Sequence, residues 1–259
     1  MQPFKKFLAS IGVGTAKIDT QLETMEVQLG GQLKGNLVVT GGEVDQEIDD
    51  IYLAIKTKYK KPNLETVYYT DGTVCEFKLT EGFTIGAGET KSIPFAVTLP
   101  LYTPITEGLS VLWVKTELAI HHSASQEDED FLIVKPLSLM QDILDSLASI
   151  GFENQEVGCE NGSLVGTLPW DTGFYQVFRF LPTTEPLKDK VEHLNVVFNP
   201  LSEDEIEVVL GIYHKPDTFL DSIKDELGLD IAKIHLNIKK EQVDSLDTIL
   251  LDSILAELD

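Results

Sequence analysis

Apolar and polar residues alternate along most of this chain, which is the pattern of half-buried β-strands. The alternation is clearest at residues 16–22, 33–39, 51–57, 95–99 and 174–180. Further strands are predicted at 67–70, 73–79, 109–120, 131–134, 155–165, 191–198, 205–213 and 231–238. Because the strands recur about every ten to fifteen residues with Gly/Pro turns between them, the sequence predicts a mostly β protein made of antiparallel β-sandwiches.

One long segment in the middle of the chain has a helical period instead. Its apolar residues fall on one face of a helix expected over 138–150: Leu139, Met140, Ile143, Leu144, Leu147 and Ile150. Ser138 and Gln141 have the spacing of a capping box, and Gly151 can take the left-handed conformation that ends a helix. Pro136 cannot donate to a strand ladder, so it ends the preceding strand.

We therefore predict a hinge at Val134, Lys135 and Pro136. It would join an N-terminal β-sandwich domain at 1–135 to a C-terminal β-sandwich domain with added helices at 136–259. A helix inside a single domain is the alternative. At 259 residues, the chain is long enough for two domains with separate cores.

Short amphipathic helices are predicted at both ends of the chain. Phe4, Phe7, Leu8 and Ile11 share one face of a helix over 3–11, with Lys5 and Lys6 on the other side. This helix is a candidate for contact with a partner or a membrane surface, and the alternative is that it packs on its own sheet. Two further helices are expected at 217–227 and 246–258.

Asp71-Gly72 is the strongest short hairpin signal in the sequence. It stands between the predicted strands at 67–70 and 73–79, so a two-residue turn is expected there. The turns at 29–31, 41–42 and 161–162 are likewise marked by glycine.

The net charge of −23 limits the kinds of molecule that the chain can bind over most of its surface. Residues 1–135 hold 12 basic and 19 acidic side chains (−7), and residues 136–259 hold 8 and 24 (−16). Arg179 is the single arginine, so no arginine cluster can read phosphates. Such a chain repels nucleic acid and anionic lipid, which favours a protein partner. Membrane contact is expected only through residues 3–11.

The sequence also bears on compartment. No apolar run of 18 residues is present, and the apolar stretch at the N-terminus is too short for a secretory signal. Cys75 and Cys159 are far apart in the sequence and are expected to be reduced thiols rather than a disulfide. These features indicate a cytoplasmic protein.

Lys56, Lys58 and Lys60 share one face of a predicted strand and form a candidate site for an anion or an acidic partner. The alternative is that their charges keep an edge strand from aggregating. No phosphate-binding loop, nucleophile elbow or Cys-x-x-Cys motif occurs. We therefore expect no catalytic residues, no cofactor and no enzyme activity.

Two clusters contain residue types that can ligate a metal ion. His121 and His122 are neighbours, and neighbouring strand residues point to opposite faces, so a shared metal is disfavoured. The acidic run at 127–130 lacks the glycine and the final glutamate of an EF-hand and is expected to be a solvated loop. Trp113 and Trp170 are expected to anchor the core or a loop. No metal is therefore expected.

Several segments of the sequence carry a resemblance to one known protein family. The resemblance rests on Phe4-Lys-Lys-Phe-Leu-Ala-Ser-Ile-Gly-Val-Gly-Thr-Ala-Lys-Ile-Asp-Thr20 and Gly35-Asn-Leu-Val-Val-Thr-Gly-Gly42. Asp50-Ile-Tyr-Leu-Ala-Ile-Lys-Thr-Lys-Tyr59 and Ile93-Pro-Phe-Ala-Val-Thr-Leu-Pro100 also carry it, with looser matches at 162–166 and 207–213. It runs from about residue 3 to about residue 240, and its N-terminal motif is specific. On these motifs the chain resembles the bacterial sporulation-control proteins called SpoOM.

The resemblance implies an arrestin-like fold of two β-sandwich domains and a regulatory rather than an enzymatic role. The family tends to have Pro-Gly-Glu where this chain has Leu29-Gly-Gly31, a change that keeps the turn chemistry. The phosphate-sensing basic residues of animal arrestins have no counterpart here. The function expected is that of a non-catalytic cytoplasmic adaptor. The alternatives are a β-sandwich that binds carbohydrate or Ca²⁺ and, less favoured, a hydrolase.

Overall fold

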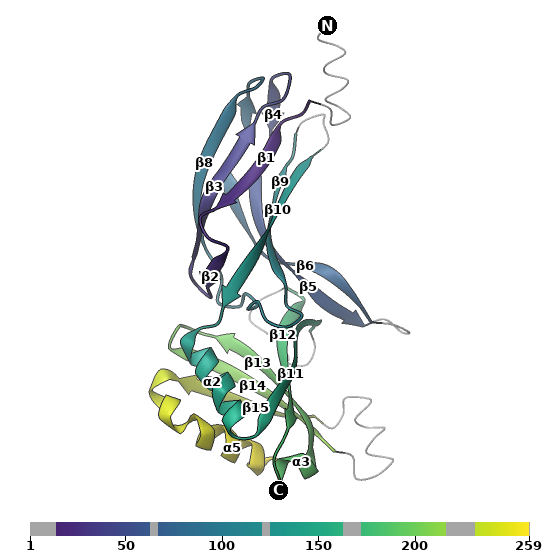
Figure 1. Cartoon of the computed structure of the whole chain (residues 1–259), viewed down its shortest axis with the longest axis vertical. Helices are drawn as coiled ribbons and strands as arrows, with labels where there is room; N and C mark the ends of the chain where they lie inside the picture. Colours follow the sequence, from purple (N-terminus) through teal and green to yellow (C-terminus); the bar gives the residue numbers. More distant parts are fainter. Residues whose placement is uncertain (1–13, 63–66, 121–124, 163–171, 216–230, 259) are drawn as a thin grey trace. The chain divides into compact units, whose positions relative to one another are not determined.

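The computed structural model describes residues 14–62, 67–120, 125–162, 172–215 and 231–258 (Figure 1). These residues are mostly β-strand with a few short helices, which confirms the fold class predicted from the alternating sequence. The predicted helices at 3–11 and 217–227 lie outside the described residues, as do His121, His122 and Trp170.

Two compact units divide the chain. The first comprises Met1–Thr57, Asp71–Pro100 and Val111–Lys135, and the second comprises Lys58–Thr70, Leu101–Ser110 and Pro136–Asp259. The second unit thus contains two segments from the first half of the sequence. Whether the units are arrestin-like sandwiches with independent boundaries at 1–135 and 136–259 stays a prediction.

The strands of the first unit form three sheets. They are β1 (Lys17–Leu22), β2 (Glu26–Gln28), β3 (Gln32–Thr40), β4 (Gln46–Ile48), β7 (Phe83–Ile85), β8 (Thr90–Thr98), β9 (Leu112–Leu118), β10 (Gln126–Lys135), the start of β5 (Ile51–Pro62) and the end of β6 (Val67–Thr80). The strand orders are β1-β3-β8, β4-β7 and β5-β9-β10-β2, with β6 paired to β5. The pairs β1–β3, β3–β8, β4–β7, β5–β9 and β9–β10 are antiparallel, and β10–β2 is parallel.

Alternate positions of these strands supply the core of the first unit. One cluster of buried side chains draws on all three sheets: Ala16, Ile18, Leu37, Val39, Ile48, Ile51, Ile85, Leu118 and Ile120. Between two strands of facing sheets, the buried hydroxyls of Thr20 and Thr116 lie 2.7 Å apart and satisfy each other. The period-two pattern therefore places apolar groups inward, and the polar pair inside it is hydrogen-bonded.

The second unit is built on an antiparallel sheet that follows the chain in order. Its strands are β11 (Phe152–Asn161), β12 (Phe174–Pro182), β13 (Val191–Pro200), β14 (Glu205–His214) and β15 (Ile231–Lys239). The outer end of β5 joins β11 in parallel through Tyr59 and Lys60. A second sheet that would complete a sandwich is not among the described residues of this unit.

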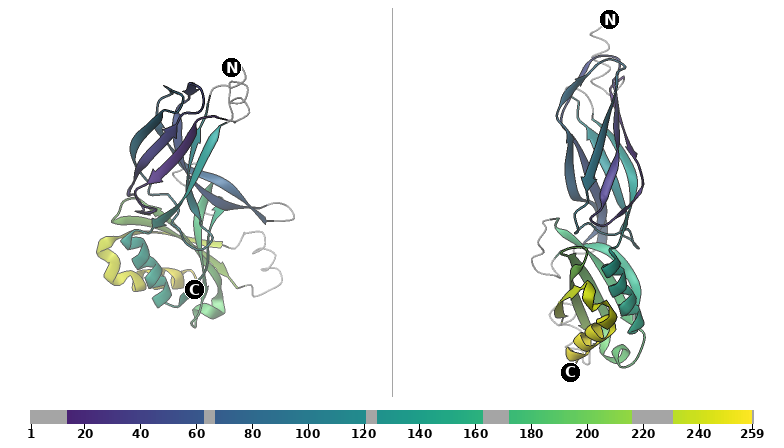
Figure 2. Two further views of the ribbon diagram at one scale, coloured as in Figure 1. Left: turned by 45° about the horizontal axis from the view of Figure 1, so that its top comes forward. Right: turned by 90° about the vertical axis from the view of Figure 1, so that its left-hand side faces the viewer.

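Helices α2 (Ser138–Ser149) and α5 (Leu246–Ala256) lie side by side in the second unit (Figure 2). The turn-like α3 (Leu187–Lys190) and η1 (Lys240–Ser245) are the other helical elements among the described residues. Ser146 and Ser149 of α2 donate hydrogen bonds to the carboxylate of Asp247 on α5, the second at 2.7 Å. These bonds hold the pKa of Asp247 below its ordinary value.

The start of α2 differs from the sequence prediction, whereas its end agrees. The predicted capping box of Ser138 and Gln141 is wrong, because Leu137 is the N-cap residue and no side chain caps the helix. The side-chain amide of Gln141 instead donates a hydrogen bond to the carboxylate of Asp145. The preceding Leu137 is extended, with φ −63° and ψ 151°, so the helix begins one residue after it. Gly151 does end the helix with φ +98°, as predicted.

The hairpin predicted at Asp71-Gly72 is also wrong. Both residues lie inside the continuous strand β6, which pairs with the preceding strand β5. Gly72 is buried, while Asp71 is exposed. A glycine in a strand is tolerated where the backbone packs closely, so pairing with β5 outweighed the local turn propensity.

Replacing Gly151 by Ala tests the end of α2. An added Cβ would lie 2.2 Å from Thr184 Oγ1, and the positive φ adds strain of ~1–2 kcal/mol for a residue with a side chain. We expect the free energy of unfolding, measured by urea titration, to fall by about 2–4 kcal/mol.

The matched control is Gly173→Ala in the same unit, where φ is +74° and nothing lies within 4 Å of the added Cβ. This variant carries the strain without the overlap, so its loss is expected to be ~1–2 kcal/mol. Equal losses in the two variants would contradict the role of the Thr184 contact.

Candidate functional site

The N-terminal candidates Phe4, Phe7, Leu8 and Ile11 lie outside the described residues. The remaining predicted residues are Lys56, Lys58 and Lys60 on β5, Val134 and Lys135 at the end of β10, and Pro136 directly after it.

Lys56, Lys58 and Lys60 alternate along β5, as the predicted period requires. Lys56 is half-buried and stands opposite Trp113 of β9 in the first unit. In the second unit, Lys58 is exposed, and the Lys60 ammonium lies 3.7 Å from a carboxylate oxygen of Glu160 on β11. The three lysines therefore have different surroundings, and one of them is already paired with a carboxylate.

The predicted hinge residues fall on both sides of the boundary between the two compact units. Val134 is 1% exposed, and Lys135 continues the parallel ladder with β2. The Lys135 carbonyl accepts a 3.0 Å hydrogen bond from the amide of Leu29, and its ammonium lies 3.5 Å from Glu26. Val134 and Lys135 are therefore fixed in the first unit, and Pro136 begins the second.

The exposed face of β9 and β10 carries apolar side chains that the sequence analysis did not identify. Phe131 is 71% exposed and Ile133 is 40% exposed, while their neighbours Leu132 and Val134 are buried. In the register of the ladder, Phe131 stands opposite Trp113, whose buried Nε1 has no hydrogen-bond partner. The signal was present as an apolar run at 131–134, but alternation alone does not show which face of such a run is covered.

The acidic run at 127–130 is part of strand β10, so the expectation of a solvated loop is wrong. Adjacent carboxylates alternate between faces, and Glu127 and Glu129 pair with the Lys115 ammonium at 2.7 and 3.8 Å. On the other face, Asp128 accepts a 2.6 Å hydrogen bond from the amide of Thr20. Within the described segments, no three His, Cys, Asp or Glu side chains come together in a way that could hold a metal ion.

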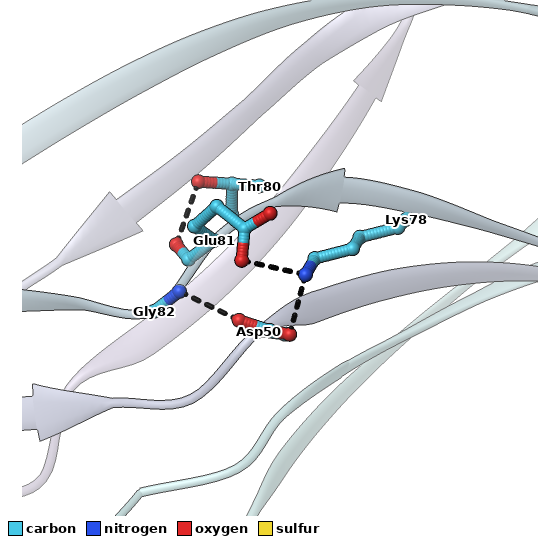
Figure 3. Close-up of polar contacts among 5 residues, drawn as sticks. All are labelled: Asp50, Lys78, Thr80, Glu81 and Gly82. Carbon is cyan, nitrogen blue, oxygen red and sulfur yellow. Dashed lines mark hydrogen bonds and ion pairs between the residues drawn. The ribbon is translucent and has the colours of Figure 1, made fainter.

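A compact ionic cluster joins the start of β5 to the end of β6 (Figure 3). The Lys78 ammonium lies 2.6 Å from both Asp50 and Glu81, and the amide of Gly82 donates to Asp50 at 2.8 Å. The Lys78 contact and the Gly82 bond hold the pKa of Asp50 below its ordinary value. The hydrogen bonds that the Lys78 ammonium donates to Asp50 and Glu81 raise the pKa of Lys78. The cluster lies at the surface and connects the two strand ends, so its role is structural rather than catalytic.

The second unit contains a cavity of about 450 Å³ beside α2 and β11. Phe152, Phe180 and Leu144 supply its apolar lining, and the carboxylates of Glu107, Asp145 and Glu153 supply negative charge. No Lys or Arg side chain lines it. The lining therefore favours a cation over an anion, which agrees with the acidic composition of the whole chain.

The two cysteines are poor nucleophiles. Burial raises the pKa of the Cys75 thiol to about 12, and Cys159 is 1% exposed beside the hydroxyl of Ser110. Both are free thiols. Because the thiolate is the reactive form, neither is suited to covalent catalysis at neutral pH.

Disrupting the Lys78 cluster should change the titration of Asp50. In a Lys78→Met variant we expect the pKa of Asp50 to rise toward its ordinary value of 3.8, measured by carboxyl-carbon NMR. Because the folded-state pKa is lowered, the stabilisation is present above pH 3.8 and is lost as the pH falls through the folded-state pKa. The two proteins should therefore converge in stability in acid. Lys34→Met, at another exposed lysine of the first unit, should leave Asp50 unchanged.

Thiol labelling tests the cysteine assignment. With iodoacetamide at pH 8 and no reductant, the folded protein should react slowly at both positions because both thiols are protonated or shielded. In denaturant both should be alkylated rapidly, as counted by mass spectrometry. Two thiols that become reactive only after reduction would instead show a disulfide.

Comparisons with known proteins identify relatives over most of the chain. A sequence profile of the family described as SpoOM protein matches residues 4–215. The sporulation-control protein Spo0M of Bacillus subtilis (strain 168) is 33% identical over 213 residues, which cover 82% of this chain and 81% of that protein.

The solved structures agree with the sequence match. The crystal structure of Spo0M, sporulation control protein, from Bacillus subtilis superposes with a TM-score of 0.81 at 26% identity. The superposition covers 95% of this chain and 100% of that chain. In the described part of the chain, no helix is long and apolar enough to cross a membrane.

Proposed function

Because the chain belongs to the SpoOM family, we propose that it is a non-catalytic regulator of sporulation that acts in the cytoplasm through contacts with other proteins. The observation that carries the proposal is the family match over residues 4–215, which includes the strands of the first unit and most of those of the second. A regulator with no reaction to perform needs surfaces rather than a catalytic centre.

The chemistry of the described residues supports a non-catalytic role. The raised pKa of Cys75 and the burial of Cys159 disfavour cysteine nucleophiles, and the Asp50–Lys78 cluster is an exposed ion-pair network. Candidate contact surfaces are more prominent: Phe131 and Ile133 are exposed, and Lys58 is exposed on β5. Exposed apolar residues beside polar ones are common at protein interaction sites.

We further propose that the protein works as two arrestin-like domains, 1–135 and 136–259, with Pro136 as the point at which their spacing changes. Val134 and Lys135 are held by β2, so a change of backbone direction would fall at Pro136 and Leu137. Binding of carbohydrate or Ca²⁺ has less support, because the acidic run is divided between two faces of β10.

Cross-linking mass spectrometry in the native host tests this function. The full-length chain should yield reproducible cross-links to one or a few proteins, because an adaptor spends much of its time bound. The same experiment on a chain without residues 1–12 shows whether the predicted N-terminal helix takes part. Recovery of cross-links within the chain alone, at native expression levels, would contradict an adaptor role.

A further inference from the structure

The outer ends of β5 and β6 form a two-stranded ribbon within the second unit, residues 58–62 and 67–70 (Figure 1). Its sequence is unusual for this chain. Residues 58–70 contain three lysines and one glutamate, so their net charge is +2 in a protein whose net charge is −23. Three of the seven tyrosines of the chain also fall in this segment. We define this feature as the lysine–tyrosine ribbon.

The β5 side of the ribbon is anchored to the sheet of the second unit. Tyr59 and Lys60 pair in parallel with Cys159 and Glu160 of β11. The Tyr59 ring stacks on Phe174 with ring centroids 4.8 Å apart, and Lys60 forms its ion pair with Glu160. The ribbon therefore has a fixed attachment and is not a free loop.

The β6 side is an open edge. In the described part of the chain, β6 pairs with β5 alone, so the outward N–H and C=O groups of residues 67–70 have no strand beside them. Tyr68 is 43% exposed and Tyr69 is 48% exposed. Because neighbouring residues point to opposite faces of a strand, this part of β6 is open on both faces as well as along its edge.

The positions of the lysines argue against simple protection of an edge. Protective charges act when they stand on the edge strand itself. Here the lysines are on β5, between β11 and β6, whereas the edge segment 67–70 reads Val-Tyr-Tyr-Thr, and the nearest charge on β6 is the carboxylate of the exposed Asp71. An aromatic, β-prone, uncharged edge is an aggregation hazard unless a partner strand uses it.

The positive charge of the lysines beside the β6 edge favours an acidic partner. Lys58 and Lys61 are exposed, and neither has an ion pair with another described residue. A second copy of this chain would pair through the same edge of β6 and leave the lysines of both copies one strand behind it, so self-pairing gains nothing from these charges. An extended acidic segment would instead place carboxylates near the ammonium groups, and the remaining charge of the protein is screened beyond ~8 Å at physiological salt.

We propose that the lysine–tyrosine ribbon binds an extended acidic segment of a partner protein, which adds as a strand to the outer edge of β6. The backbone ladder supplies affinity, Lys58 and Lys61 select acidic side chains, and Tyr68 and Tyr69 cover the apolar positions of the added strand. This inference rests on the proposed role in protein interaction and gives that role a surface and a class of partner.

A fluorescent seven-residue peptide, Glu-Glu-Val-Glu-Glu-Val-Glu, tests the site on the full-length chain. Because strand side chains alternate, this order places carboxylates on both faces of an added strand, as Lys58 and Lys61 require. Binding is measured by fluorescence anisotropy at physiological salt. We expect the Lys58→Glu/Lys61→Glu variant to bind about tenfold more weakly, because each lysine attracts the peptide and each glutamate repels it. Lys17→Glu/Lys34→Glu makes the same change in net charge on exposed lysines of the first unit and should change the affinity less than about twofold.

Two further peptides separate the ladder from general electrostatics. A peptide with Pro in place of Val keeps the charge but cannot donate to a strand ladder, so it should not bind. A peptide with Lys in place of Glu should also fail to bind. The proposal is overturned if the wild type does not bind the Glu-Val peptide, if the two double variants weaken it equally, or if the Pro peptide binds as well.

Hydrogen exchange and cross-linking in cells distinguish this proposal from self-association and from the broader adaptor role. If hydrogen exchange at 68–70 slows as the protein is concentrated, a second copy occupies the edge and the proposal is wrong. If cells show a cross-linked partner that the Lys58→Glu/Lys61→Glu variant retains, the adaptor role stands and the ribbon site fails. If no partner is cross-linked in cells, the adaptor role fails, whatever the peptide does.

Discussion

The architecture depends on the backbone pairing of strand β5, which supplies residues to both compact units. Its first half pairs antiparallel with β9, and its second half pairs in parallel with β11. Backbone N–H and C=O groups must be paired when they are buried, so this strand has to be extended through its whole length. The side chains on it then alternate, and Ile51, Leu53 and Ile55 enter the core of the first unit.

That constraint also explains why β6 behaves as it does. Once β5 is extended, its neighbour can pair along it, and the Asp71-Gly72 dipeptide is drawn into a strand instead of a turn. The ionic cluster of Asp50 and Lys78 then ties the start of one strand to the end of the other. Surface ion pairs of this kind add little stability alone, so they support the pairing rather than cause it.

The sequence predicts the fold class and many strands because alternation reflects burial directly. The strands predicted at 33–39, 205–213 and 231–238 correspond to β3, β14 and β15, and Gly151 ends α2 as expected. The Ser138 cap and the Asp71-Gly72 turn failed because both rest on local signals that tertiary pairing and chain direction can override. Local pattern also did not show that residues 58–70 belong to the second unit, since that depends on which strands meet in space.

The candidate surfaces were less predictable than the fold. Lys56, Lys58 and Lys60 were found by their spacing, yet only the ladder shows that Lys60 is paired with Glu160 and that the neighbouring strand is the open edge. The exposed Phe131 lies in an apolar run that reads as core in the sequence. Whether such a side chain is exposed depends on which other elements pack over it, and the residue type alone does not determine this.

The contact between α2 and α5 has a consequence for the order of events during synthesis. Ser146 and Asp247 are 101 residues apart, so at ~5–20 residues per second the ribosome needs roughly 5–20 s to supply the second helix after the first. During that time the apolar face of α2, with Leu139, Met140 and Ile143, lacks its C-terminal neighbour. The nascent chain thus exposes an apolar surface that chaperones can bind until α5 has been synthesised, and a product truncated before α5 would keep that surface open.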